Sequence, residues 1–309
     1  IPVFILLTIG IIMMFSTSSL VGISDYDDAY FFIKRHLIFV CIGLVALFIG
    51  MTISHQIYKR FIGILFVGTI FLLILTLTPL GVKIGGAQRW LNFGFIRFQP
   101  VELAKFAIIV FIAIGLDRSK KYINHFIKGC LPLLLIPAIP LLFVVLQPDL
   151  GNTAIILFVI FSLFLLSSMP FRYIVLLTSM AITGLVGVVL SNPYQWIRIT
   201  SFLNPWADPL GKNYHMVQSM IAIGSGGLTG VGLGESRLKN FYLPLQYSDF
   251  IFSIICEEGG FFIAIFIIAL YFFILIKTYK IVVKAEKRYS FYLGMGCILL
   301  IVWQSLINI

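Results

Sequence analysis

The chain has 309 residues, of which 60% are hydrophobic and only 11% are charged, and its formal net charge at neutral pH is +10. A soluble domain usually has about a quarter of its residues charged, so this composition excludes an ordinary soluble protein. The lysines and arginines form no clustered stripe of the kind that binds nucleic acid. We therefore infer that the positive charge orients the chain in the membrane and attracts anionic lipid.

Nine apolar windows, each near twenty residues long, follow one another along the chain. At 1.5 Å per residue, a helix of about that length crosses roughly 30 Å of hydrocarbon. The windows are continuous rather than alternating, which favours helices over a membrane β-barrel. The sequence therefore predicts an all-α polytopic membrane protein forming one domain over residues 1–309, with spans near residues 1–20, 37–54, 61–80, 101–116, 130–147, 153–168, 174–191, 250–275 and 291–308.

Basic side chains gather in alternate loops between these windows. If the N-terminus is cytoplasmic, the inner loops contain Lys59, Arg60, Arg172 and two denser groups within residues 118–128 and 277–288. Most aspartates fall in the opposite loops, although some basic residues lie there too. Because short cytoplasmic loops carry an excess of lysine and arginine, we predict a multi-pass protein in this orientation.

The cysteines and histidines show no metal-binding or redox pattern. All four cysteines fall inside predicted spans, where a thiol behaves as a small buried hydrophobic group, and none forms a CxxC pair. The four histidines lie in separate loops or interfaces without HxxxH spacing. We therefore predict neither a disulfide nor a zinc site.

A long interruption, residues 192–248, separates the seventh predicted span from the eighth. The count of spans places it on the outer side of the membrane. A loop of this length is more often functional than inert, and its Tyr194, Trp196, Trp206 and Tyr214 suit the headgroup zone. We expect this loop to fold onto the membrane, partly as short interfacial helices.

Within this loop, the stretch AIGSGGLTGVGLGESRLK is rich in glycine. Glycines free the backbone to turn its N–H groups inward, so the stretch could cradle a phosphate. It lacks the Lys-Ser/Thr ending of a P-loop and does not fit GxGxxG after a strand. A flexible or tightly packed hairpin is at least an equal alternative.

A second group of polar residues lies in GAQRWLNFGFIRFQPVELAKF. Pro100 suits the first position of a helix, Glu102 falls in the first turn, where the helix dipole favours an anion, and Lys105 lies three residues further on the same face. We expect Glu102 and Lys105 to pair. The pair could be purely structural or could bind something charged within the membrane, and these two interpretations are compatible.

Three carboxylates mark the stretch YLPLQYSDFIFSIICEEGG. Asp249 begins the eighth predicted span, where desolvation could raise its pKa into the working range of a general base. Alternatively Ser248 or Asp249 is an ordinary N-cap of the helix. Glu257 and Glu258 lie about 12 Å deeper on an ideal helix, so we expect them to make polar contacts with neighbouring helices or to share a proton rather than to assist Asp249.

In the predicted orientation, Arg89, Glu102, Asp149 and Asp249 all lie at the outer face, which suggests a cavity open to that side. Three functions fit this arrangement. A transporter or lipid flippase would explain charges within the membrane. An enzyme could act on a membrane-tethered substrate from outside, and a scaffold could recruit partners through its loops.

Several motifs in order resemble one known family. The chain is similar to successive signatures of the SEDS family of bacterial cell-wall polymerases over most of its length from the fourth span to the eighth. The matching motifs are FQPVELAK, LQPDLGNTA, the segment from ITSFLNPWADPLGKNYHMVQ to GVGLGESRLKNFYLP, and SDFIFSIICEEGG. Within the family, NPWADPLG and GVGLGESRLK are closest to the division type. The elongation and sporulation types are its relatives.

The resemblance implies a peptidoglycan glycosyltransferase that polymerises lipid II at the outer face of the bacterial cytoplasmic membrane during cell division. The family's essential acidic residue falls on Asp249, as candidate general base, and its QPxELxK residues fall on Glu102 and Lys105. The loop motifs place five further residues in candidate substrate-contact positions: Arg198, His215, Gln218, Ser219 and Lys239. Basic side chains of the outer cavity, Arg89 among them, would neutralise the pyrophosphate, with or without a divalent cation such as Mg²⁺ or Mn²⁺.

The resemblance also implies partners and one further helix. A class B penicillin-binding protein would crosslink the glycan, and other membrane proteins of the division machinery would assemble with the polymerase at the septum. The family has a tenth span, which falls beyond Ile309. Many relatives have His-Thr where this chain has Tyr247-Ser248, so the neighbours of Asp249 differ. A lipid II flippase or a non-catalytic scaffold remains the alternative function.

Overall fold

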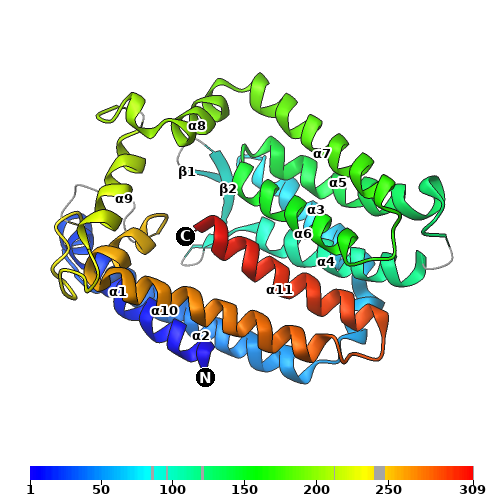
Figure 1. Cartoon of the computed structure of the whole chain (residues 1–309), viewed down its shortest axis with the longest axis horizontal. Helices are drawn as coiled ribbons and strands as arrows, with labels where there is room; N and C mark the ends of the chain where they lie inside the picture. The colour runs from blue at the N-terminus through cyan, green and yellow to red at the C-terminus, as the bar shows by residue number, and fades with distance from the viewer. Residues whose placement is uncertain (85–86, 95–96, 120–121, 212, 240–247, 309) are drawn as a thin grey trace. The chain divides into compact units, whose positions relative to one another are not determined.

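The computed structural model describes residues 1–84, 87–94, 97–119, 122–211, 213–239 and 248–308, and Figure 1 shows its elements. The long helices are α1 (Pro2–Tyr26), α2 (Phe31–Thr52), α3 (Gln56–Thr76), α4 (Pro100–Arg118), α5 (Leu131–Leu146), α6 (Leu150–Leu165), α7 (Phe171–Ser191), α10 (Ile251–Val282) and α11 (Arg288–Asn308). A π-helical turn (Phe126–Cys130) leads into α5. Each of the nine predicted windows therefore falls on a helix.

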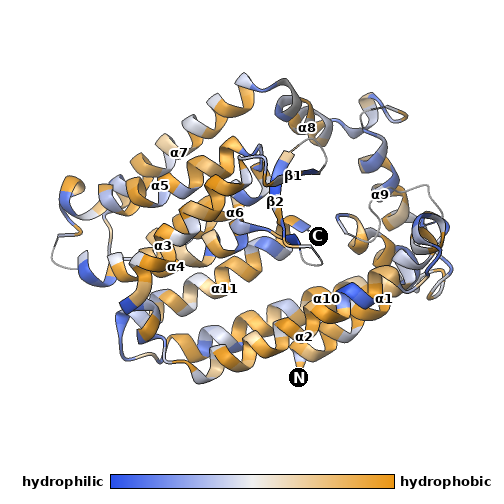
Figure 2. Ribbon diagram, turned by 180° about the vertical axis from the view of Figure 1, so that it is seen from behind, coloured by the Kyte–Doolittle hydropathy of each residue, from blue (hydrophilic) through white to orange (hydrophobic). Residues whose placement is uncertain are grey.

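Seven helical segments of the described chain are long and apolar enough to cross a membrane: α1, α2, α3, the segment Phe126–Leu146, α7, α10 and α11. Helix α6 is apolar but shorter, with 16 residues. Figure 2 shows apolar residues along the length of these helices. Large apolar side chains such as Phe48, Val67 and Phe272 are 61–67% exposed, as expected where lipid rather than water is the solvent. The prediction of an all-α, multi-pass membrane protein is confirmed, and the count of nine spans stays a prediction.

By its internal contacts, the chain divides into two compact units. Unit 1 comprises Ile1–Ser54 and Ile197–Lys277 with the last two residues, and unit 2 comprises His55–Trp196 and Thr278–Ile307.

In unit 1, α1 and α10 share an apolar core. Met13 of α1 packs with Ile254, Ile255 and Ile267 of α10. The short turn between α1 and α2 carries an exposed ion pair, in which Lys34 Nζ lies 2.7 Å from a carboxylate oxygen of Asp28. The hydrogen bond from Lys34 holds the pKa of the Asp28 carboxyl below its usual range.

In unit 2, α4 is the most thoroughly buried helix and packs against α3, α5 and α6. Before α4, the chain forms a small antiparallel sheet in the order β1 (Gly81–Ile84), β2 (Ala87–Asn92), β3 (Arg97–Phe98). Val82 pairs with Trp90, and Leu91 pairs with Phe98. This sheet was not predicted from the sequence.

The predicted outer loop contains helix α8 (Pro193–Leu203), a 3-10 turn (Pro205–Ala207) and helix α9 (Tyr214–Ser225). The short helices expected in this loop are therefore present, and their place at the membrane surface stays a prediction. Residues 212 and 240–247 of the loop lie outside the described residues.

Candidate functional site

Asp249 lies in a turn, two residues before α10 begins, and its side chain is exposed. Within the described chain, its carboxylate has no hydrogen bond or ion pair. The first turn of α10 is instead closed by backbone bonds, in which the N–H groups of Ser253 and Ile254 donate to the carbonyl of Phe250. An N-cap at Asp249 would accept a hydrogen bond from a backbone N–H of the first turn, and the described chain has no such bond. The carboxylate is therefore free to meet a ligand.

The first turn of α9 lies beside the start of α10. The ring of His215 stacks on the ring of Phe250, with centroids 6.3 Å apart. His215 is exposed, and Gln218, three residues further and hence on the same face of α9, is half-buried. Ser219 is buried, and its hydroxyl donates to the carbonyl of Met216 at 2.9 Å. Of the three predicted contact residues on α9, His215 and Gln218 are thus accessible and Ser219 is engaged within its own helix.

Arg198 belongs to α8, and its side chain lies outside the described residues. Its role as a substrate contact stays a prediction.

Helix α10 is interrupted at Gly260, whose φ of 68° and ψ of −172° are not helical. In a continuous helix, the N–H groups of residues 261 and 262 would donate to the carbonyls of Glu257 and Glu258. Here residues 226–234, which we call the glycine loop, supply the hydrogen-bond partners of these two N–H groups and of these two carbonyls. The bonds run from Val231 to Glu257, from Gly232 to Glu258, from Phe261 to Gly227 and from Phe262 to Leu228, with N–O distances of 3.0–3.3 Å.

Close backbone contact requires glycine at this junction. A Cβ on Gly230 would lie 2.1 Å from the carbonyl oxygen of Glu258, and one on Gly260 would lie 2.3 Å from the backbone N of Gly230. Both glycines also have φ values between 68° and 80°, which side chains disfavour. Of the two alternatives for the glycine-rich stretch, the structure therefore has the tightly packed one.

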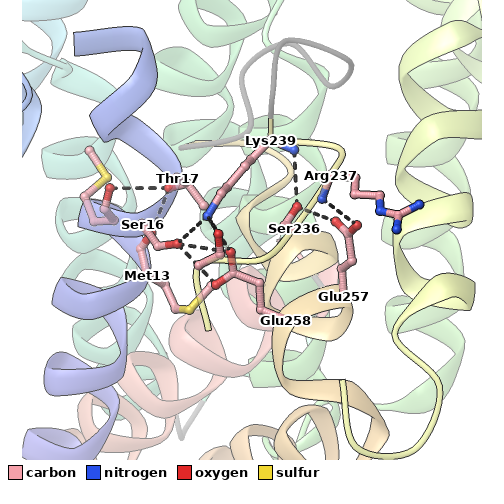
Figure 3. Close-up of polar contacts among 10 residues, drawn as sticks. Met13, Ser16, Thr17, Ser236, Arg237, Lys239, Glu257 and Glu258 are labelled. Atoms are coloured by element: carbon pink, nitrogen blue, oxygen red, sulfur yellow. Dashed lines mark hydrogen bonds and ion pairs between the residues drawn. The ribbon is translucent and has the colours of Figure 1, made fainter. Parts of the chain in front are cut away.

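The side chains of Glu257 and Glu258 bind the chain just after the glycine loop, as Figure 3 shows. Glu257 accepts hydrogen bonds from the hydroxyl of Ser236 and from the backbone N–H of Arg237. An oxygen of Glu258 lies 3.0 Å from Nζ of Lys239, and the hydroxyl of Ser16 on α1 donates to the same carboxylate at 3.1 Å. The expected polar contact with a neighbouring helix is confirmed for Glu258, through Ser16 of α1, whereas the partners of Glu257 lie in the loop.

Arg89 of β2 joins the small sheet to the junction between α5 and α6. Its guanidinium donates to the carbonyl of Gln147 at 3.3 Å and to that of Pro148, and it lies 3.7 Å from the carboxylate of Asp149. Asp149 in turn caps α6 by accepting from the backbone N–H of Asn152. Arg89 and Asp149, which sequence analysis placed at one membrane face, are therefore neighbours.

Glu102 and Lys105 pair as predicted, with 2.8 Å between Oε1 and Nζ. The pair is asymmetric, because the side chain of Lys105 is 1% exposed and that of Glu102 is 49% exposed. Lys105 also donates to Oε1 of Gln304 on α11 at 3.1 Å. The ammonium group is thus buried and bound by two groups of unit 2, whereas half of the Glu102 side chain remains accessible.

The predicted site residues fall into two groups. Asp249, Arg198, His215, Gln218, Ser219 and Lys239 belong to unit 1, and Arg89, Glu102 and Lys105 belong to unit 2. The expected cavity in which both groups meet stays a prediction. Sequence reasoning did not identify Ser16, Ser236 or Gln304 as partners of charged residues, because isolated neutral polar side chains, whether in apolar helices or in a loop, carry no distinctive signal.

Within the described chain, no three His, Cys, Asp or Glu side chains gather closely enough to hold a metal ion.

The sequence comparisons cover the chain from end to end. Residues 1–309 match the family model described as Cell cycle protein, which bears the names FtsW, RodA and SpoVE. Stage V sporulation protein E of Bacillus subtilis (strain 168) is 39% identical over 99% of this chain and 84% of its own length. A probable peptidoglycan glycosyltransferase FtsW of Geobacter sp. (strain M18) is 33% identical over 98% of this chain and 83% of its own length.

Solved structures share the fold. One, described as the structural coordination of polymerization and crosslinking by a peptidoglycan synthase complex, has a TM-score of 0.76 and 24% identity, and the match covers 99% of this chain and 84% of that one. The crystal structure of the rod shape determining protein RodA of Thermus thermophilus has a TM-score of 0.66 and 22% identity, over 99% and 82% of the two chains. With a family model matched over its whole length and these relatives, the chain belongs to the FtsW, RodA and SpoVE family, the SEDS family that its motifs resemble.

Proposed function

We propose that this protein is a peptidoglycan glycosyltransferase that polymerises lipid II into glycan strands at the outer face of the cytoplasmic membrane. The observation that carries the proposal is the Asp249 carboxylate, exposed and without a hydrogen bond in the described chain, at the family's acidic motif. Relatives named as probable peptidoglycan glycosyltransferases, about 33% identical over nearly the whole chain, support this reaction class.

In the proposed reaction, Asp249 takes the proton of the acceptor sugar's 4-hydroxyl as that oxygen attacks the anomeric carbon of the donor. The bond from that carbon to the pyrophosphate breaks, and the electron pair leaves with the pyrophosphate. An α-linked donor then yields a β-linked glycan by a single inverting displacement, so no covalent glycosyl-enzyme forms. Cationic side chains would stabilise the charge that builds on the leaving group.

We assign substrate contact first to the accessible members of the predicted set. His215 and Gln218 face solvent on α9 beside the start of α10, and Glu102 is half-exposed on α4. Arg89 and Arg198 are proposed partners of the pyrophosphate. Three other members, Lys105, Ser219 and Lys239, are already engaged by groups of the protein, so direct contact with substrate would first require those bonds to open.

An apolar groove in unit 2 is our candidate for the polyprenyl tail of one lipid II molecule. It has a volume of about 530 Å³ and is lined by α5, α6, α7 and α11. Phe158 and Trp303 stack in its wall with centroids 4.7 Å apart. A cavity with walls that are almost wholly apolar suits a hydrocarbon chain and excludes a charged headgroup.

We further propose that the protein works with a class B penicillin-binding protein and other membrane proteins of the division machinery, at the septum. The fold shared with a structure described as a peptidoglycan synthase complex supports such a partner. Because a sporulation protein and FtsW proteins are both among the relatives, a role in sporulation is the alternative to division.

The test is glycan synthesis from purified lipid II by the protein reconstituted with its penicillin-binding partner. We expect Asp249→Asn to abolish polymer while leaving the thermal unfolding temperature unchanged, because the carboxylate makes no bond that folding requires. The matched control is Asp27→Asn, which changes an exposed aspartate of unit 1 in the left-handed conformation that asparagine tolerates. Equal polymer from Asp249→Asn and wild type would overturn the assignment of the base.

A second candidate, a lipid II flippase, is favoured by two features of α10. The helix is broken at Gly260 and carries a buried charge at Glu258, and transporters use both features at their binding sites. A vesicle assay for lipid II translocation separates the two functions. Translocation by Asp249→Asn at the wild-type rate, with no polymer from either protein, would favour the flippase.

A further inference from the structure

The first half of α10, residues 251–259, is a short helix that depends on its surroundings for its position. It begins two residues after Asp249 and ends at the break at Gly260. Nine residues of helix span about 13 Å, too short to be stable without tertiary contacts. Its last carbonyls are bound by the glycine loop, and its apolar side packs on α1 through Met13.

A buried ion pair closes this junction. The side chain of Glu258 is 0% exposed and that of Lys239 is 9% exposed. Lys239 lies in the segment that follows the glycine loop, Glu258 lies on the first half of α10, and Ser16 of α1 donates to Glu258. Figure 3 shows Lys239 between Ser16 and Glu258. Three segments far apart in the sequence are therefore joined at one carboxylate.

Lys239 has no donor left for a substrate. An ammonium group has three N–H donors, and Nζ of Lys239 already meets three oxygens: Oγ of Ser16 at 3.3 Å, Oε1 of Glu258 at 3.0 Å and the carbonyl of Gly234. Because the group is also buried, a pyrophosphate could reach it only if this junction came apart.

We propose that Lys239 and Glu258 are positioning residues, which hold the first half of α10 against α1 and the glycine loop and thereby fix Asp249 for catalysis. This inference rests on the proposed function. A misplacement of about 1 Å at a reacting group can reduce the rate about a hundredfold. An unpaired charge left in the junction would draw in water or move away from the apolar core. The first half of α10 would shift with it, and so would the turn before it, which holds Asp249.

The experiment compares Lys239→Met, Glu258→Gln and the double variant Lys239→Met/Glu258→Leu with wild type, each reconstituted with its partner. Replacing both members of a buried pair by apolar residues often preserves stability, whereas removing one does not. The control is Lys34→Met, which removes a lysine from the exposed pair with Asp28 in the same unit. Two quantities are measured: kcat and KM for lipid II per folded molecule, and hydrogen–deuterium exchange of residues 226–234 and 251–259.

We expect each single variant to lower kcat at least tenfold with KM within about threefold of wild type, and to speed exchange in both segments. The double variant should recover much of the exchange protection and of kcat. Lys34→Met should change neither quantity. A rise in KM in every variant that lacks Lys239, the double variant included, would instead show that Lys239 contacts substrate and would overturn the inference.

Two further outcomes would also overturn it. Single variants with wild-type kcat per folded molecule would reduce the pair to a purely structural role, and unchanged exchange would show that the pair does not hold the helix. The proposed function fails separately, if wild type makes no polymer or if Asp249→Asn is fully active. In that case the exchange measurement still decides whether the pair positions this helix.

Discussion

The imidazole of His215 stacks on the ring of Phe250, with 6.3 Å between centroids and 29° between the planes. Phe250 directly follows Asp249 in the chain, so the contact places the first turn of α9 next to the proposed base. Because His215 is exposed and its ring nitrogens have no hydrogen bond in the described chain, a headgroup that reaches Asp249 would meet this ring.

The first prediction concerns this imidazole. In His215→Phe the stack on Phe250 is kept and the ring nitrogens are lost, so we expect KM for lipid II to rise about tenfold, which corresponds to one hydrogen bond of about 1.4 kcal/mol. His215→Ala should raise KM further, because the aromatic contact with Phe250 is lost as well. Steady-state kinetics measures both variants. Wild-type KM in His215→Phe would mean that the ring serves packing alone.

The second prediction concerns the break in α10. Gly260→Ala would force a Cβ into a backbone conformation with φ of 68° and to within 2.3 Å of the backbone N of Gly230. We expect the free energy of unfolding in detergent to fall by at least about 2 kcal/mol. Gly43→Ala is the matched control, because no atom lies within 4 Å of its Cβ position on α2. Equal stability of the two variants would contradict the packing described here.

Apolar runs predict the helices well because each helix is surrounded either by lipid or, as in α4, by the apolar interior of the protein. The window at residues 291–308, for example, falls within α11 (Arg288–Asn308). The β1–β2–β3 sheet was missed because its strands have only four, six and two residues. No run of alternating apolar and polar residues indicates these strands.

The break at Gly260 could not be predicted from the apolar run, which continues through it. The interruption is stable only because the glycine loop, about thirty residues earlier, supplies the partners of four backbone groups. The partner of Glu258 on α1, Ser16, lies 242 residues away. The Glu102–Lys105 pair could be predicted because its spacing places both side chains on one face of a helix. Asp249 was put forward as candidate base by the family resemblance, and that role stays a prediction. The contacts between distant segments came only from the structure.

The third prediction concerns Arg89 and the small sheet. Arg89→Lys keeps the charge near Asp149, but an ammonium group cannot reproduce the fork that bonds the carbonyls of Gln147 and Pro148. We expect the free energy of unfolding to fall by about 1.5 to 3 kcal/mol. Arg97→Lys, on the exposed β3 strand, is the control and should stay within about 0.5 kcal/mol of wild type. Chemical denaturation in micelles measures both, and equal values would show that the bridge contributes nothing.

The fourth prediction follows from the unequal burial of Glu102 and Lys105. Glu102→Ala leaves a buried ammonium group without its carboxylate, so we expect a loss of about 2 to 3 kcal/mol in the free energy of unfolding. Lys105→Met removes the buried charge and leaves Glu102 half-exposed to water, so its cost should stay within about 1 kcal/mol. The reverse order of stability, measured under one set of conditions, would contradict this account of the pair.

The last prediction tests the apolar groove of unit 2. Ala181→Phe adds a ring to the wall of the 530 Å³ cavity and should displace a few methylene groups of a bound polyprenyl tail, each worth about 0.8 kcal/mol. We expect KM for long-chain lipid II to rise tenfold or more, while a short-chain analogue that does not fill the groove is used as well as by wild type. Ala46→Phe, on the exposed face of α2, is the control for added apolar bulk. If Ala181→Phe and wild type have the same preference for tail length, the tail binds elsewhere, and the groove is only a space between helices that membrane lipid fills.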